Sequence, residues 1–255
     1  MRNIYLCEDN VEGIFSAIYL AYEQKKGHKN NAIHINQPGF NRQLFCDYIS
    51  VETDYEKATK VARTIRRDVS EQAYEFLRKV SVSHREDRAD AMYRFVIEAL
   101  HIGCDALRHL TAPHMQILCE IERGINNEVC HWIEFLRFQE LENGILFGRI
   151  NPKSAILPYM SEHFTDRFWS ESWVIADTVH HTLLIHKKKY PTIYANMDEV
   201  DVDELKLEHS EEEIMMQELW KMFVDTIAIK ERINPKLQRQ LLPLHFRKYM
   251  KEFSE

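Results

Sequence analysis

Residues 136–150 read LRFQELENGILFGRI, and this stretch decides the fold. At its centre, Asn143-Gly144 separates two apolar-rich runs, 136–142 and 145–150. Asn-Gly between such runs is the strongest short-range signal for a β-hairpin, because both residues tolerate the positive φ angles of a tight turn. The stretch therefore predicts two antiparallel strands joined by a tight turn.

The residues that follow extend this hairpin into a small sheet. Residues 158–168 carry a helical pattern, and 173–176 and 182–186 read as two further strands around Asp177. The order hairpin, helix, hairpin over 135–196 predicts a small antiparallel sheet with a helix packed on it. We expect an acidic linker at 197–210 and then C-terminal helices over 211–255 that close the core. Ser210 opens the first of these helices and Pro243 the last.

Upstream of the hairpin, residues 1–134 are predicted to be mostly helical. Two short strands are expected at 4–7 and 44–51, and the polar stretch 27–39 reads as a loop. Helix starts are marked by Asp9 or Asn10, by a capping box from Thr53 to Glu56, by Ser70 and by Pro113. The fold class is therefore α+β, in a single domain over 1–255.

Composition narrows the class of protein further. Of 255 residues, only seven are Gly and seven Pro, which favours long regular elements. The net charge of −7 argues against a protein that coats nucleic acid indiscriminately. Five widely spaced Cys without a C-x-x-C pair indicate reduced thiols. Neither a secretory signal nor a run of about 20 apolar residues is present, so we expect a cytoplasmic protein without a membrane span.

Motifs of common cofactor chemistry are missing from the sequence. It contains no P-loop, no G-x-G-x-x-G fingerprint and no C-x-x-x-C-x-x-C for a radical-SAM iron–sulfur cluster. His180 and His186 lack a suitably spaced Cys or carboxylate, so they make a poor zinc site. We therefore expect no metal and no cofactor.

Two regions concentrate positive charge on this negative chain. Lys60, Arg63 and Arg67 share one face of a predicted helix, opposite its apolar stripe. Residues 230–252 hold seven Lys or Arg against two Glu, a local charge of +5 that includes Arg247 and Lys248. Either region is a solvated helix face or a surface that binds phosphates.

Five further side chains are candidates for binding nucleic acid or a partner. His163 and Arg167 are four apart on the predicted helix, where they present donors to a phosphate or form a structural ion pair with Asp166. Arg239 and Gln240 lie just before Pro243, where they contact a backbone or base, or form a polar joint between helices. Arg137 either contacts a ligand or is a buried Arg paired with Asp177 or Glu140.

Three stretches of the chain, in this order, carry a resemblance to a known family. They are YLCEDNVEGIF at 5–15 with AYE at 21–23; FLRFQEL at 135–141, ILP at 156–158, HFTDRF at 163–168 and WVIAD at 173–177; and IKERINPKLQRQ at 229–240 with Pro243, Lys248 and Tyr249. Together they resemble the bacterial family of probable DNA metabolism proteins, a domain of unknown function. The match runs nearly from end to end. The family pattern Glu-Ala-His-Arg is Glu128, Val129, Cys130 and His131 here, and a Trp common in the C-terminal stretch is Arg247.

The resemblance implies a setting and not a reaction. Members of the family are encoded beside a DNA modification or repair protein of the radical-SAM class, and related domains are fused to uracil-DNA-glycosylase-type domains. This implies a DNA metabolism or repair accessory protein that acts with a separate radical-SAM protein, by binding nucleic acid or that partner. The alternative is a hydrolase or nuclease, which needs a cleft where His163, Asp166, Arg167 or Glu128 converge. Whether the chain is an enzyme stays open.

Overall fold

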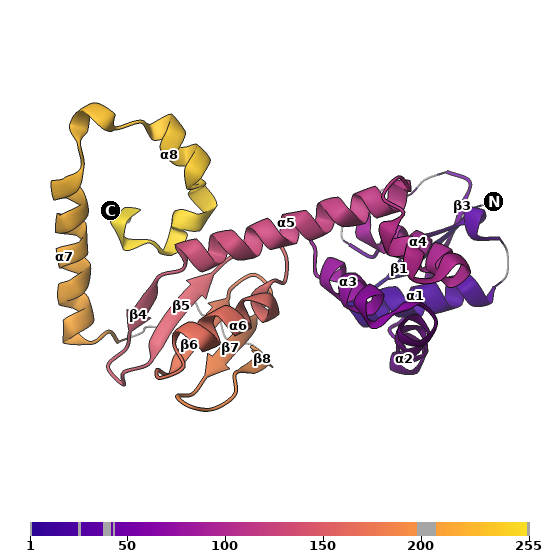
Figure 1. Ribbon diagram of the computed structural model, residues 1–255, viewed down its shortest axis with the longest axis horizontal. Helices are drawn as coiled ribbons and strands as arrows, with labels where there is room; N and C mark the ends of the chain where they lie inside the picture. Colours follow the sequence, from indigo (N-terminus) through magenta and orange to yellow (C-terminus); the bar gives the residue numbers. More distant parts are fainter. Residues whose placement is uncertain (1, 25–26, 38–41, 43, 198–207, 254–255) are drawn as a thin grey trace. The chain divides into compact units, whose positions relative to one another are not determined.

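The computed structural model describes residues 2–24, 27–37, 42, 44–197 and 208–253. The chain divides into two compact units, Met1–Asn126 and Asn127–Glu255, hereafter the N-terminal and C-terminal units. The boundary between them falls within the long helix α5 (Pro113–Phe135), which begins at Pro113 as the sequence predicts (Figure 1). The α+β class is confirmed, since helices accompany a sheet in each unit.

A parallel sheet of three strands forms the centre of the N-terminal unit. β1 (Arg2–Cys7) pairs with β2 (Asn31–Ile35) on one side and with β3 (Cys46–Ser50) on the other. β1 and β3 are the two expected strands, whereas β2 corrects the loop predicted at 27–39. Nearly all of β2 is buried, so its apolar and polar residues do not alternate. The buried Asn31 amide donates to the Ala21 carbonyl, which satisfies a side chain that reads as a loop residue.

The helices of this unit begin at short polar side chains. They are α1 (Val11–Glu23), α2 (Tyr55–Thr64) with a π-helical turn η2 (Ile65–Val69), α3 (Glu71–Ser81) and α4 (Arg88–Ile102), besides the 3-10 turns η1 (His28–Asn30) and η3 (Gly103–Arg108). Asn10 and Ser70 cap α1 and α3, as expected. The predicted capping box from Thr53 to Glu56 is wrong for α2. Asp54 caps the helix, while the Thr53 hydroxyl donates to the Glu8 carboxylate.

A mixed sheet of five strands forms the C-terminal unit. Its strands are β4 (Phe138–Glu140), β5 (Leu146–Ile150), β6 (Trp173–Asp177), β7 (Thr182–His186) and β8 (Ile193–Asn196), in that spatial order. The predicted hairpins β4–β5 and β6–β7 are both present, with α6 (Leu157–Arg167) between them. β5 and β6 are parallel, because the chain crosses one face of the sheet through α6 before it returns (Figure 1). The expected purely antiparallel sheet is thus mixed, and it gains β8.

Aromatic side chains fill the space between α6 and the sheet. The ring of Phe138 lies edge-on to those of Phe164, Phe168 and Trp173, at centroid distances of 5.5, 5.4 and 6.4 Å. Gly148 lies beneath this cluster, where an added Cβ would be 2.9 Å from Leu136 Cδ1. A larger residue at this position would have to displace the side chains of Leu136 and Phe138.

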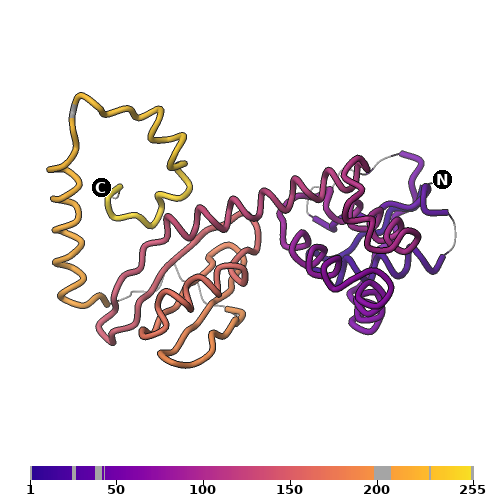
Figure 2. Tube along the Cα trace, in the orientation of Figure 1, coloured from indigo at the N-terminus to yellow at the C-terminus, as the bar shows by residue number. Residues whose placement is uncertain are grey.

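The C-terminal elements leave the sheet at β4 and return to α5 of the same unit. They are α7 (Glu211–Ile227), η4 (Lys230–Arg232), α8 (Pro235–Leu241), η5 (Leu244–Tyr249) and η6 (Lys251–Phe253). Figure 2 traces this path, with α7 and α8 on different sides of a wide turn of the chain. Ser210 caps α7 as predicted, whereas the helix expected after Pro243 consists of two 3-10 turns. Most of the predicted acidic linker, 198–207, lies outside the described residues.

The five cysteines are all free thiols. Cys7 is buried, while Cys104 in the N-terminal unit and Cys130 in the C-terminal unit are exposed. Within the described ranges, no helix combines the length and the apolar character that crossing a bilayer requires.

Candidate nucleic-acid interface

The carboxyl ends of β5 and β6 define one edge of the C-terminal unit. Because the two strands are parallel, the residues that follow Ile150 and Asp177 lie side by side. Asp177 is fully buried and accepts hydrogen bonds from the amides of Val179 and His180, and its other oxygen lies 2.7 Å from His180 Nδ1. Thr178 hydrogen-bonds to the Ile150 carbonyl, which ties the two strand ends together. This edge is therefore rigid and polar.

η5 packs against this edge and against the C-terminal half of α5. The Tyr249 hydroxyl lies 3.1 Å from the Thr178 hydroxyl. Phe246 is buried against Trp132 and Phe135, with ring centroids 4.8 and 5.2 Å apart. Next to it, burial lowers the pKa of His245, and the charge of Lys153 lowers it further. The basic C-terminal stretch is thus anchored by an aromatic cluster.

Two polar atoms at the end of β5 have no partner among the described residues. They are Nε of Arg149 and Oδ1 of Asn151, both buried within half-buried side chains. The guanidinium of Arg149 lies 5.5 Å from the ring of Phe147, which cannot neutralise its charge. A buried polar group without a hydrogen bond is costly, and these two atoms are closed to solvent, although the rest of each side chain is only half-buried.

The C-terminal basic segment, residues 230–251, contains two kinds of cation. Some are exposed and have no carboxylate partner among the described residues, and we call these the open cations; others contact neighbouring groups of the same unit. Arg232, Lys236 and Arg239 are exposed, and no carboxylate within the described chain pairs with them. Gln240, beside Arg239, is exposed as well. The sequence left two alternatives for Arg239: contact with a nucleic-acid backbone or base, or a polar joint between helices. The Arg239 side chain is open to solvent, whereas a polar joint would place it against a neighbouring helix.

Arg247 and Lys248 have neighbours within the unit. Arg247 donates to the carbonyls of Gln238 and Leu242, at 3.1 and 2.9 Å, and so closes the carboxyl end of α8. The ammonium of Lys248 lies 4.9 Å from the ring centroid of Tyr249. Arg247 thus stabilises the segment that presents the open cations, where the family pattern has a Trp.

Arg137, His163 and Arg167 each contact other side chains of the C-terminal unit. Arg137 pairs with Glu252 at 3.1 Å and donates to three carbonyls at the end of α5, so neither Asp177 nor Glu140 is its partner. His163 and Arg167 are exposed on α6, where each contacts a neighbouring Phe ring.

The residues that the hydrolase alternative requires lie on two elements, with His163, Asp166 and Arg167 on α6 and Glu128 on α5. Glu128 accepts a hydrogen bond from the Lys153 amide at 2.5 Å, on α5 rather than α6. A cavity of about 330 Å³ in this unit is lined by other side chains, among them Arg137, Phe138, Glu213 and Trp220.

The basic face predicted around Lys60 lies in the N-terminal unit, and one of its three cations, Arg67, pairs with a carboxylate. Arg67 forms two hydrogen bonds with Asp68, at 2.6 and 2.7 Å, and these raise the pKa of its guanidinium. Lys60 lies 5.9 Å from the ring centroid of Tyr19. Arg63 is exposed and has no carboxylate partner within the described residues. Lys60 is exposed as well, and no carboxylate within the described residues pairs with it.

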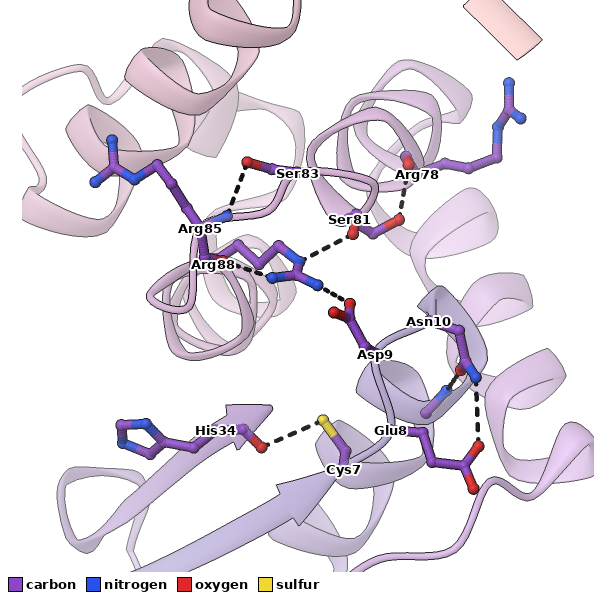
Figure 3. A network of polar contacts seen from close by, with 11 residues as sticks. Cys7, Glu8, Asp9, Asn10, His34, Arg78, Ser81, Ser83, Arg85 and Arg88 are labelled. Carbon is purple, nitrogen blue, oxygen red and sulfur yellow. Dashed lines mark hydrogen bonds and ion pairs between the residues drawn. The ribbon is translucent and has the colours of Figure 1, made fainter. Parts of the chain in front are cut away.

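A buried arginine that the sequence reading missed holds the N-terminal unit together (Figure 3). Arg88 is 1% exposed and donates to the carbonyls of Ser81 and Arg85 and to the carboxylate of Asp9. Burial lowers its pKa, while Asp9 opposes the shift. Arg88 therefore ties the start of α4 to the carboxyl end of β1. All its contacts are internal, so we assign it a structural role.

The signal for Arg88 was present in the helical spacing. Arg88 lies four and seven residues before Met92 and Phe95, which belong to the buried stripe of α4. A charged residue on such a stripe indicates a buried ion pair. Nearby, burial raises the pKa of Cys7 to about 12. Cys7 is therefore a protonated thiol at neutral pH and a poor nucleophile.

Comparisons with known proteins identify a family and no activity. No protein among those of curated function matches the chain. A solved structure described as the DHH domain of a member of the s1p family of ribosomal proteins is 10% identical, over 72% of this chain and 73% of that chain. Its TM-score is 0.29, so this likeness carries no argument about fold or function. A family model described as Domain of unknown function (DUF4130) matches residues 86–252, which is more than half of the chain. The chain therefore belongs to the DUF4130 family, whose function is unknown.

Proposed function

We propose that this protein is an accessory factor of DNA metabolism that binds the nucleic-acid backbone through its C-terminal basic segment. The observation that carries the proposal is the open state of Arg232, Lys236 and Arg239 on a chain of net charge −7. Lysines and arginines that lie free of carboxylates gain most from phosphate contact, because binding releases the counterions condensed on the nucleic acid. The resemblance to probable DNA metabolism proteins supports DNA as the nucleic acid.

The edge against which the segment packs adds two half-buried polar side chains, Arg149 and Asn151. Their atoms Nε and Oδ1 are buried, so contact with DNA would fall to the exposed remainder of each side chain. Phosphate oxygens accept from guanidinium groups, while an amide side chain can bond to sugar or base. Backbone contacts of this kind position a protein without reading sequence, so we expect little sequence preference.

The test is a salt titration of DNA affinity with two charge-matched variants. Lys236→Gln with Arg239→Gln removes two open cations, whereas Lys187→Gln with Lys188→Gln removes two exposed cations at the end of β7. Fluorescence anisotropy with single- and double-stranded DNA gives affinity between low and moderate salt. We expect the first variant alone to bind about tenfold more weakly, with the slope of log affinity against log salt reduced by about 2. Equal losses in both variants would show that only overall charge matters.

We further propose that a separate radical-SAM protein is the partner, a proposal supported by the family resemblance. The chain itself has no C-x-x-x-C-x-x-C motif, so the cluster would belong to that partner. Co-purification of the full-length chain with the neighbouring radical-SAM protein checks this. If neither DNA nor this partner binds, the assignment to DNA metabolism loses its support.

A further inference from the structure

One face of α7 exposes an apolar stripe. Met215, Leu219, Met222 and Phe223 lie at spacings of four, seven and eight residues, which places them on one side of the helix. Between 48% and 62% of each is exposed. Contiguous apolar surface of this kind on a soluble protein marks an interaction site, and methionines suit such a surface because they adapt their shape.

The inner face of α7 is already used by its own unit. Glu213 accepts a hydrogen bond from the Glu140 amide at 3.2 Å, and Gln217 and Trp220 line the cavity beside β4. Met215, Leu219 and Met222 occupy other positions around the helix, while Phe223, at the margin of the stripe, stacks on Trp220 with ring centroids 5.8 Å apart. The stripe is therefore an additional apolar surface that the fold of the chain leaves exposed.

Negative charge flanks the stripe. Glu211, Glu218 and Asp225 recur every seven residues and so lie along one edge of it. Across α7, five acidic residues stand against the single cation Lys221. A partner for this face must offer apolar side chains beside positive ones.

The chain carries such a surface in its own C-terminal basic segment. Ile233, Leu237 and Leu241 are spaced by four residues and are 63%, 49% and 69% exposed. Beside them lie the open cations Arg232, Lys236 and Arg239. Within one chain α7 and α8 run on different sides of the turn (Figures 1 and 2), and among the described residues no hydrogen bond or ion pair joins them. Two complementary surfaces of one chain are thus both uncovered.

We propose that a second copy of this chain covers them, with α7 of each protomer docked on the basic segment of the other. A two-fold axis makes this contact twice, which gives a closed dimer. Direct pairing of α7 with α7 is disfavoured, because the acidic edges would then meet. The proposal goes beyond nucleic-acid binding and sets a limit on it. The dimer contacts and the phosphate contacts use the same three cations, so a second copy and DNA compete.

Charge reversal and mixing test the pairing directly. One variant carries Glu211→Lys, Glu218→Lys and Asp225→Lys; the other carries Arg232→Glu, Lys236→Glu and Arg239→Glu. Light scattering with size-exclusion chromatography should find the unmodified chain dimeric at micromolar concentration and each variant monomeric. An equimolar mixture should restore a dimer, because both contacts then join opposite charges. A monomeric unmodified chain, or a dimer that either reversal leaves intact, overturns the proposal.

A second variant separates this proposal from the proposed function. Leu219→Ser with Phe223→Ser removes apolar side chains that are about half exposed, so we expect the fold and its circular dichroism to persist. All cations remain in place. We expect the dimer dissociation constant to rise at least tenfold while DNA affinity stays equal or increases. Loss of DNA binding in this variant contradicts competition, and an unchanged dimer contradicts the interface, whatever the result for Lys236 and Arg239.

Discussion

Arg88 in the N-terminal unit and Arg239 in the C-terminal unit are arginines in opposite environments. In the N-terminal unit Arg88 is buried and donates hydrogen bonds to Asp9 and to two carbonyls. Arg66 and Arg67 of the same unit pair with Glu71 and Asp68. In the C-terminal unit Arg232 and Arg239 stand open to solvent without a carboxylate among the described residues. The contrast teaches that the location of positive charge matters less than whether neighbouring groups already neutralise it. Local charge along the sequence overstates the N-terminal surface for this reason.

The largest effect should follow from removing the buried arginine. Arg88→Ala leaves Asp9 and two carbonyls without their donor and opens a cavity, so we expect the N-terminal unit to lose about 3 kcal/mol of stability. All four tryptophans lie in the C-terminal unit. Urea unfolding followed by circular dichroism should therefore shift to lower urea, while the transition seen by tryptophan fluorescence stays in place.

Arg239→Ala is the matched control, since an exposed and unpaired arginine contributes within about 0.5 kcal/mol. Should the two substitutions destabilise the chain equally, the distinction between structural and open arginines would fail.

A smaller effect should follow from opening cations that are now paired. Asp68→Asn with Glu71→Gln removes the carboxylates that neutralise Arg66 and Arg67. If these ion pairs prevent Arg66 and Arg67 from binding phosphates, DNA affinity at low salt should rise about threefold in this variant, the gain expected for weak new phosphate contacts. Anisotropy measures it. Glu75→Gln, which removes the carboxylate that Arg78 contacts, is the comparison. No gain in the double variant would mean that pairing with Asp68 and Glu71 is not what keeps Arg66 and Arg67 from binding DNA.

The smallest effect concerns pH and again separates the units. Burial lowers the pKa of His28 and His34 in the N-terminal unit, and the charges of His101 and Arg2, respectively, lower it further. Because the folded-state pKa is below the unfolded value of 6.5, the unfolded chain takes up protons first as the pH falls. Stability of this unit should be complete above pH 7 and decrease below pH 6.5. Urea midpoints between pH 7.5 and 5.5 should show this, with a shallower dependence in His34→Gln.

Local signals made much of the C-terminal sheet predictable. Asn143-Gly144 forms its turn from neighbouring residues alone, so the β4–β5 hairpin follows from a short stretch. The parallel pairing of β5 with β6 depends on residues on either side of α6, and no local pattern encodes which edge of β5 remains free. β2 was missed for a related reason, since the partners that satisfy Asn31 come from β1 and α1.

The candidate site divides along the same line. The exposed state of Arg239 agrees with a polar, helix-ending stretch between Asn234 and Pro243. The role of Arg247 could not be read, because the carbonyls that it caps are fixed only when η5 folds back on α8. Arg149 and Asn151 were overlooked because the sequence does not show which side-chain atoms are left without a hydrogen-bond partner after folding.

The distribution of thiols offers a practical handle on the two halves of the molecule. Cys7 is buried and stays protonated far above neutral pH, so maleimide or iodoacetamide reagents should spare it and leave β1 undisturbed. Cys104 and Cys130 are exposed, one in each unit. A chain that keeps only one of these two as its solvent-facing thiol would carry a dye or spin probe on a chosen half, and so report which half responds when DNA or a second copy arrives.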